Sequence, residues 1–484
     1  MDEKRKIGID TIILLSSRLA NFFFVFLVSL ILTRGLGPEN YGIWSFAISI
    51  AILSTTIGSL SLNIITTKYL PFYFGKGEFG KVKYIFLQSL KLVLASAIIL
   101  GIILYSISFS LPYSNVIILL LPYFIFSTIY SLTSATLFAI RRIKEFSIID
   151  TSYIIIQLII LAIFYLQGLT INETIISFTI SSVMTTVASF LIVNKTVLSK
   201  YRTEESEEKI SSIFRISLPW HFSVISNNLS EKIPIFILTF LAFVYGIKEV
   251  GFFSFAISLT TIVAALITSL ADIGIPFIIQ LSGTKKKRRI PTVTMTLTRY
   301  TYIATLPLIF ILAFGSETII TFFFGSKYLP AAPMIMVLSI VLIPITFRKL
   351  ITASILIKNK IQIYFYIELL RLAISIPLIF FLSYNFGGMG ASIGFTISLF
   401  VTYSLFSVID KTLTKKIMKT IMKIFVSSLV FAILYFIPRH MLAFICSVLG
   451  LSVLYFAILF VAKEFTKEDW KKVLLILEGA ISNG

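Results

Sequence analysis

Long apolar runs separated by short polar turns form the pattern of this chain. Each run is close to the ~20 residues that an α-helix needs to cross a bilayer. The fourteen runs lie at 9–33, 42–67, 84–106, 115–140, 146–166, 172–194, 216–243, 250–281, 297–314, 330–357, 362–384, 388–409, 420–437 and 441–462. Because the hydrocarbon core offers no hydrogen-bond partners, and because the runs are too long for barrel strands, we predict a helix for each. The pattern predicts an all-α integral membrane protein with fourteen transmembrane helices, and we expect the first to be retained rather than cleaved as a signal peptide.

Lysine and arginine are distributed unevenly between the two sides of this topology. Connections after odd-numbered runs contain only Arg34, Lys248, Lys327 and Arg439. The N-terminal segment, the connections after even-numbered runs and the C-terminal segment contain most of the others. Cytoplasmic loops of membrane proteins are enriched in lysine and arginine. The pattern therefore predicts a multi-pass protein of the cell membrane with both termini in the cytoplasm.

One stretch occurs twice. Residues 37–50 read GPENYGIWSFAISI and residues 246–259 read GIKEVGFFSFAISL, so seven of fourteen positions are identical at an offset of 209. A second, weaker match aligns residues 134–150 with residues 352–368 at an offset of 218. Two matches in the same order at nearly the same offset indicate two homologous halves.

The repeat predicts the domain organisation. Six helices per half is an even number, so both halves have the same orientation, as in a parallel repeat about an axis along the membrane normal. We predict an N-lobe at 1–200 with helices 1–6, a cytoplasmic inter-lobe loop at 201–215 and a C-lobe at 216–410 with helices 7–12. The last two helices and a cytoplasmic tail occupy 411–484.

Composition excludes several functional classes. Of 484 residues, 57% are hydrophobic and 13% are charged, whereas soluble domains contain about 25% charged residues. The single Cys446 and two histidines rule out an intrachain disulfide and a Cys/His metal cluster. We attribute the net charge of +20 to the positive-inside pattern rather than to nucleic-acid binding. The segment GKGEFGKV at 75–82 lacks the Ser/Thr of a P-loop and follows a membrane helix, so we predict no ATPase.

Three segments resemble a known family. LTRGLGPENYGIWSFAIS at 32–49 and FFFGSKYLPAAPMIMVLS at 322–339 resemble polysaccharide and O-antigen transporters, which are oligosaccharide-lipid flippases of the multidrug/oligosaccharidyl-lipid/polysaccharide (MOP) superfamily. SSRLANFFF at 16–24 is similar to the first helix of the related peptidoglycan-precursor flippases, with Arg18 at the position of an arginine. Those proteins have a second arginine where this chain has Phe24, which makes a peptidoglycan precursor a less favoured substrate.

The resemblance implies a fold and a function. The expected fold is two six-helix lobes around a central cavity, as in the multidrug (MATE) exporters of this superfamily. The expected activity is translocation of an oligosaccharide linked to polyprenyl phosphate or pyrophosphate from the cytoplasmic to the outer leaflet by alternating access. This serves surface polysaccharide or glycoconjugate synthesis. The protein is expected to be a transporter rather than an enzyme, with no cofactor, and its partners to be membrane lipid, the lipid-linked glycan, and glycosyltransferases or a polymerase.

Polar residues within the spans are candidates for a cationic binding cavity. A charge at mid-span costs about 2.5–3.5 kcal/mol, so it usually faces a cavity or a partner. Arg18 lies about three turns into the first run, and Asn21 follows on the same face. We predict that these two contact phosphate or sugar; the alternative for Arg18 is helix packing, or reaching the cytoplasmic headgroups.

The second half offers matching candidates. Helix 7 contains a cluster that we predict lines the cavity, although Glu231 and Lys232 could also neutralise each other as a structural pair. Its members are Asn227, Asn228, Glu231 and Lys232. Glu368 and Arg371 in helix 11 are three residues apart, so a cavity position and a structural salt bridge are equally compatible with the sequence.

The two repeat offsets relate residues of the two halves. Asn227 aligns with Arg18, and Glu368 aligns with Asp150. Either carboxylate of the second pair could instead flank a helix start. Asp272 in helix 8 is a candidate for Na⁺ or H⁺ coupling. The alternative is a carboxylate near the cytoplasmic end that is solvated or paired with a basic loop.

Two other functions stay open at this level. A cation-coupled multidrug exporter of the same fold would need acidic residues in its cavity, whereas this chain has more basic than acidic residues within spans. A non-transporting membrane scaffold for glycan assembly would leave the charges within spans unexplained. A polysaccharide polymerase is a weaker alternative, because no predicted outer loop is long.

Overall fold

The computed structural model describes residues 3–205, 210–282, 290–357, 361–405, 411–437, 440–462 and 464–465. Within these ranges every regular element is a helix, which confirms the predicted all-α class. The chain divides into two compact units by packing. Unit 1 comprises Met1–Ser258 and Ile361–Ser398, and unit 2 comprises Leu259–Lys360 and Leu399–Gly484. The lobes at 1–200 and 216–410 stay a prediction.

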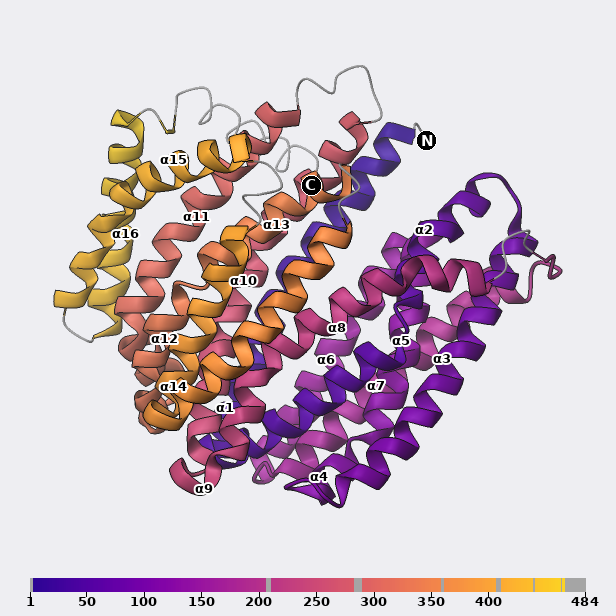
Figure 1. The fold of residues 1–484 in the computed structure, drawn as a ribbon, viewed down its shortest axis with the longest axis horizontal. Helices are drawn as coiled ribbons and strands as arrows, with labels where there is room; N and C mark the ends of the chain where they lie inside the picture. Colours follow the sequence, from indigo (N-terminus) through magenta and orange to yellow (C-terminus); the bar gives the residue numbers. More distant parts are fainter. Residues whose placement is uncertain are drawn as a thin grey trace. The chain divides into compact units, whose positions relative to one another are not determined.

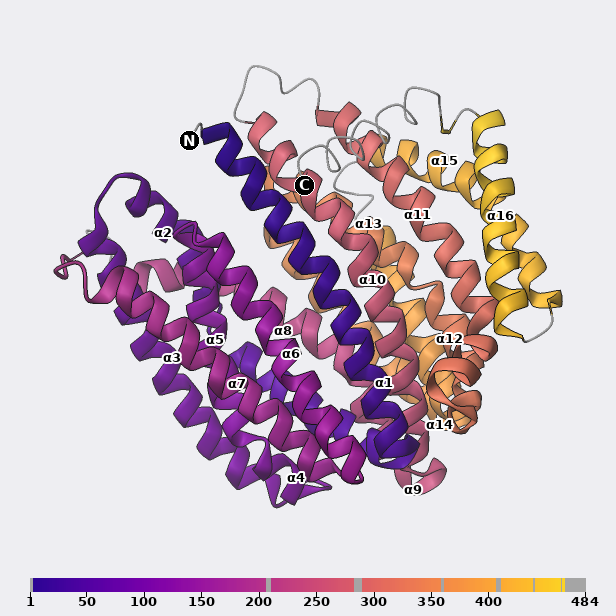
Figure 2. The same ribbon diagram turned by 180° about the vertical axis from the view of Figure 1, so that it is seen from behind.

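Unit 1 contains the first half of the chain and parts of the second (Figures 1 and 2). Helix α1 packs along α6 and also contacts α5 and α8. The helices α10 and α14 pass from unit 1 into unit 2. The elements that lie in or begin in unit 1 are α1 Glu3–Gly58, α2 Leu62–Gly75, α3 Phe79–Ser108, α4 Ser114–Leu119, α5 Leu121–Ala139, α6 Ile143–Gln167, α7 Ile171–Val193, the π-helix Asn194–Leu198, α8 Ile210–Phe240, α9 Ala242–Tyr245, α10 Ile247–Ser282 and α14 Ile361–Ser404.

Unit 2 is built around α11, which packs against α12, α13, α15 and the 3-10 helix that follows α15. Two buried tyrosines join its helices through backbone carbonyls. The Tyr302 hydroxyl donates to the Ile343 oxygen at 3.0 Å, and the Tyr455 hydroxyl donates to the Ile303 oxygen at 2.9 Å. Its remaining elements are α11 Ile290–Ile319, the π-helix Ile320–Phe324, the 3-10 helix Ser326–Ala331, α12 Ala332–Ser339, α13 Leu342–Ile357, α15 Lys411–Ser428, the 3-10 helix Leu429–Phe436 and α16 Met441–Val461.

The helices accommodate the fourteen predicted spans. Eleven helical segments of the described chain are long and apolar enough to cross a membrane. Two of them, Ser16–Gly58 and Gln362–Ser404, have 43 residues each and are interrupted by a glycine with positive φ, Gly37 or Gly387. Each therefore has the length of two spans. Helix α8 is a further predicted span that is not among these eleven segments, and a polar cluster interrupts its sequence.

The repeated stretch forms a direct crossing within unit 1. Gly37 and Gly246 occupy equivalent positions and both have positive φ, at 69° and 82°, so each ends one helix and begins the next. A Cβ on Gly251 would overlap the carbonyl oxygen of Pro38, and one on Gly42 would lie 2.5 Å from that of Ile247. Pro38 and Ile247 are themselves equivalent at the offset of 209. The two copies thus pack backbone to backbone with approximate two-fold symmetry, which gives a physical reason for both glycines.

Polar contacts accompany this crossing. The Tyr41 hydroxyl donates to Ser258 Oγ at 3.3 Å, and Lys248 Nζ lies 3.8 Å from Glu39 Oε2. Glu39 and Lys248 are equivalent positions of the repeat, so the pair spans the local symmetry axis. Both side chains are more than half exposed, so the ion pair contributes little to stability.

Candidate functional site

A first polar cluster joins α1 to α6 and comprises Arg18, Asn21, Tyr130 and Asp150. Asn21 Nδ2 donates to Asp150 Oδ2 at 2.8 Å, and the Asn21 side chain is buried. Arg18 lies one turn before Asn21 and is exposed, within electrostatic range of Asp150. Tyr130 on α5 lies beside the same carboxylate. The cluster therefore holds one guanidinium on an accessible surface, supported by a partly buried carboxylate.

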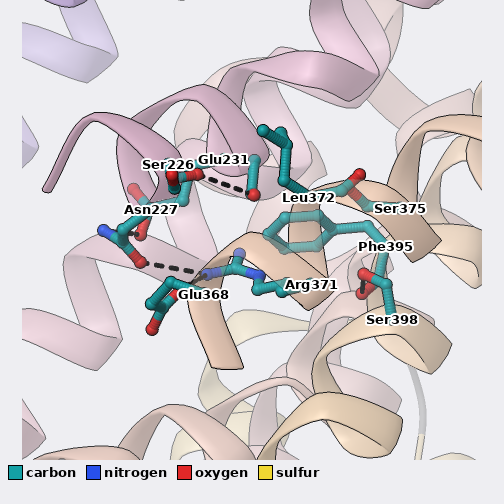
Figure 3. Close-up of polar contacts among 10 residues, drawn as sticks. Ser226, Asn227, Glu231, Glu368, Arg371, Leu372, Ser375, Phe395 and Ser398 are labelled. Carbon is teal, nitrogen blue, oxygen red and sulfur yellow. Dashed lines mark hydrogen bonds and ion pairs between the residues drawn. The ribbon is translucent and has the colours of Figure 1, made fainter. Parts of the chain in front are cut away.

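A second polar cluster joins α8 to α14 and comprises Asn227, Glu231, Glu368 and Arg371 (Figure 3). Arg371 Nη1 donates to Asn227 Oδ1 at 3.0 Å and lies 3.5 Å from Glu368 Oε2. Asn227 Nδ2 donates to Glu231 Oε1 at 3.2 Å. The side chains of Glu368 and Arg371 are 0% and 1% exposed, so this ion pair is fully buried.

An aromatic ring completes the surroundings of Arg371. The centre of its guanidinium lies 5.8 Å from the centroid of the Phe395 ring, further along α14 (Figure 3). A cation over an aromatic face is attracted by the ring quadrupole, more strongly where water is excluded. The guanidinium is thus held by a carboxylate, an amide and a ring, all within unit 1.

The two clusters occupy equivalent places in the repeat. Asn227 aligns with Arg18, and Glu368 aligns with Asp150. Asp150 lies seven residues after Ile143, where α6 begins, and Glu368 lies seven residues after Ile361, where α14 begins. In each half a polar pair therefore joins the first helix to the fifth, at or within one turn of the aligned carboxylate. The interpretation of these carboxylates as flanking helix starts is wrong, because both lie about two turns inside their helices.

The other predicted residues lie close to the second cluster or outside the described side chains. Asn228 Nδ2 donates to Thr56 Oγ1 at 2.8 Å, which joins α8 to α1. Lys232 is half-buried and lies within electrostatic range of Glu231. The backbone of Asp272 lies in α10, but its side chain is not among those described, so its role in ion coupling stays a prediction. Among the side chains that are described, no three His, Cys, Asp or Glu residues are placed to hold a metal ion.

One further polar contact was not expected. His221, well inside α8, is buried, and its Nδ1 lies 2.8 Å from Ser61 Oγ. The partner could not be found from sequence, since Ser61 owes its position to a left-handed turn that interrupts the second predicted span at Leu60–Ser61.

Comparison with known families decides the relationship of this chain. A family profile described as polysaccharide biosynthesis protein matches residues 7–282, more than half of the sequence. The chain belongs to the polysaccharide biosynthesis protein family. A search of curated proteins finds no sequence match.

Solved structures share the fold of this polysaccharide biosynthesis family member. The lipid II flippase MurJ in an inward closed conformation aligns with a TM-score of 0.68 and 15% identity, over 93% of this chain and 97% of MurJ. An inward-facing multidrug resistance MATE transporter of the MOP superfamily aligns with a TM-score of 0.65 and 14% identity, over 84% and 98%. The eukaryotic MATE transporter AtDTX14 aligns with a TM-score of 0.59 and 16% identity, over 86% and 99%.

These matches confirm the predicted fold class. The structures that share the fold are transporters and flippases, not enzymes. This family member is therefore a multi-pass membrane protein with the fold of those transporters and flippases.

Among polar residues of the spans, Asp150 was not selected as a site residue from sequence. The signal that could have selected it was available, because it aligns with Glu368, and Glu368 was chosen for its spacing from Arg371. A charged residue matched across two halves of a repeat should be interpreted in the same way in both.

Proposed function

We propose that this protein is a flippase that moves an oligosaccharide linked to polyprenyl phosphate or pyrophosphate from the cytoplasmic to the outer leaflet. The observation that carries the proposal is that Arg18 is the exposed charged residue of the two clusters, whereas their other charged side chains are buried or half-buried. Arg18 is exposed, whereas Glu368 is fully buried against Arg371, and Asp150 accepts from Asn21. The accessible charge is therefore positive, which suits a phosphate-bearing substrate.

Arg18 is the residue that we assign to the substrate phosphate. A guanidinium offers parallel N–H donors that match two phosphate oxygens, and such charge-assisted bonds are stronger than neutral ones. Asn21 and Asp150 are positioning residues: the buried Asn21–Asp150 hydrogen bond fixes α1 against α6, and the carboxylate holds the guanidinium nearby. The prenyl chain stays in lipid, so only the headgroup needs a polar path.

Movement of the headgroup follows the organisation of the repeat. We infer that the lobes at 1–200 and 216–410 rock about the inter-lobe loop and expose the headgroup to alternate sides, with both termini cytoplasmic. Export of a negative headgroup from an inside-negative cell gains about 2.3 kcal/mol per charge at 100 mV. The substrate would come from cytoplasmic glycosyltransferases, and an outer polymerase or ligase would consume it.

The runner-up is a cation-coupled multidrug exporter of the same fold. Such a protein needs an accessible carboxylate to hold an organic cation. The three carboxylates of the two clusters are each paired with a side chain of the protein, which weighs against this function.

Transport in proteoliposomes separates the two functions. The vesicles would contain either a short glycan on polyprenyl pyrophosphate or a fluorescent organic cation, with wild type, Arg18→Ala and Arg34→Ala compared. We expect the wild type to translocate the headgroup and Arg18→Ala to lose this activity. Arg34→Ala is the matched control, because it removes a guanidinium from the other end of the same span, and it should retain translocation. Transport of the cation without transport of the glycan lipid would overturn the proposal.

A further inference from the structure

Helix α15 has three distinct faces. Its buried face follows helical spacing, with Thr414, Ile417, Ile421 and Ile424 packed in unit 2, where α15 contacts α11. The other two faces are exposed. One exposed face carries four lysines, Lys415, Lys416, Lys419 and Lys423. The other exposed face carries large apolar residues, namely Met418, Met422, Phe425 and, just past the end of the helix, Leu429.

The depth of α15 is fixed by its contacts with α16. Lys423 Nζ lies 2.8 Å from Oε1 of Glu464, just past the end of α16, and the ring centroids of Phe431 and Tyr455 lie 5.6 Å apart. Later residues of α15 and its continuation thus meet earlier residues of α16, so the two run antiparallel from Lys423 onward. Residues before Lys423 precede this contact along α15, and the contact lies just past the end of α16 at Val461.

This geometry places the lysine face at the membrane boundary. The start of α15 and the end of α16 lie at the same end of unit 2 (Figures 1 and 2). From Lys411 to Lys423 the helix is about 18 Å long at 1.5 Å per residue, and this stretch leads to the contact with Glu464 just past the end of α16. By the positive-inside pattern, this boundary is the cytoplasmic one.

The apolar face beside the lysines identifies the occupant. A soluble acidic protein or a nucleic acid would neutralise the lysines but leave Met418 and Met422 in water; these side chains are 53% and 61% exposed. An anionic bilayer surface satisfies both faces at once, because an interfacial helix buries its apolar side at the acyl boundary and points its lysines at the headgroups. Anionic lipids of the cytoplasmic leaflet attract such basic segments.

We propose that the first turns of α15 form a binding surface for the phosphate headgroups of anionic phospholipids in the cytoplasmic leaflet. Lys415, Lys416 and Lys419 contact the phosphates, and Met418 and Met422 enter the acyl boundary. Lys423 is held by Glu464 and sets the depth of the helix. This surface lies in unit 2 and does not depend on the proposed substrate.

The test uses the full-length protein with an environment-sensitive fluorophore attached to the thiol that Met418→Cys introduces in a Cys446→Ser background. Detergent-solubilised protein is titrated with mixed micelles containing phosphatidylglycerol or phosphatidylcholine, and with soluble glycerol 1-phosphate. We expect a blue shift with phosphatidylglycerol only. Each lysine is worth about fivefold in affinity, so Lys415→Gln, Lys416→Gln and Lys419→Gln together should weaken binding about a hundredfold.

A matched control removes the same charge elsewhere. Lys144→Gln, Lys195→Gln and Lys200→Gln change three exposed lysines of unit 1, and this variant should bind as the wild type does. Equal shifts with both lipids, an equal loss of affinity in the control variant, or saturation by glycerol 1-phosphate alone would each overturn the proposal. Because the assay measures binding and not transport, its failure would leave the flippase proposal unaffected.

Discussion

The two polar clusters of unit 1 join equivalent helices, but the arginine is exposed in one cluster and buried in the other. In both, the first helix of a half meets the fifth through a polar pair, Asn21 with Asp150 and Asn227 with Arg371. In the first cluster the guanidinium of Arg18 is exposed. In the second, Arg371 is buried against Glu368.

This difference separates a residue available to substrate from one engaged in structure. A buried ion pair loses its hydration, and its mutual attraction and hydrogen bonds approximately compensate, so removal of one partner is costly. An exposed arginine is not enclosed by the helices and stays available to a phosphate. The duplication therefore conserved the register of the helices while the position of the charge diverged.

The strongest test of this contrast is Arg371→Met. It leaves the buried Glu368 without its guanidinium, and we expect a loss of about 3–5 kcal/mol in the free energy of unfolding. Denaturant titration in detergent, followed by intrinsic fluorescence, measures this loss. The double variant Arg371→Met/Glu368→Gln should recover most of the lost stability. If Arg371→Met alone left the free energy of unfolding unchanged, Arg371 would not be compensating the buried charge of Glu368.

The glycine crossing allows a comparison of the two copies of the repeat. Gly251→Ala should destabilise the protein by about 1–3 kcal/mol, because the added Cβ would overlap the Pro38 carbonyl. In Gly42→Ala the added Cβ would approach the Ile247 carbonyl oxygen less closely, so the loss of stability should be smaller. Unfolding in detergent gives both values.

Gly450→Ala is the control for the crossing. This glycine lies in α16 with open space around it, and alanine there should be neutral or stabilise by up to about 1 kcal/mol. A loss in Gly450→Ala as large as that in Gly251→Ala would contradict the explanation by close approach.

Substitution of Arg18 tests whether the exposed arginine serves transport and not stability. Loss of a charge-assisted interaction of about 1.5–3 kcal/mol corresponds to a roughly 10- to 150-fold fall in headgroup transport for Arg18→Gln. Arg18→Lys should retain more activity, since it keeps the charge but loses the bidentate geometry. Stability should change by less than about 0.5 kcal/mol in both. An unfolding defect comparable to that of Arg371→Met would place Arg18 in the structural class instead.

The smallest expected effect concerns the contact between the halves at Asn228. Asn228→Ala and Thr56→Val each remove the hydrogen bond between these side chains, and hydrogen bonds between membrane helices contribute about 0.6 kcal/mol on average. A double-mutant cycle isolates the coupling energy. Fully additive single effects would mean that this contact does not contribute.

Local patterns in the sequence carried most of the fold. The hydrophobic runs predicted the helices and left breaks between residues 33 and 42 and between residues 243 and 250, where Gly37 and Gly246 have positive φ. The break at Leu60–Ser61 was missed, since its turn contains no glycine or proline and the residues with positive φ are a leucine and a serine. Within the candidate site, the pairing of Glu368 with Arg371 followed from their spacing, but the contact with Asn227 did not.

The sequence by itself determined the helical class, the membrane environment and the duplication, because hydropathy, helical periodicity and repeated segments are properties of neighbouring residues or of direct alignment. Only the tertiary structure decided which arginine is exposed and which is buried, why both Gly42 and Gly251 are glycines, and how deep α15 begins. These depend on contacts between helices far apart in the chain. Burial and pairing are set by what packs against a residue, and no local pattern contains that information.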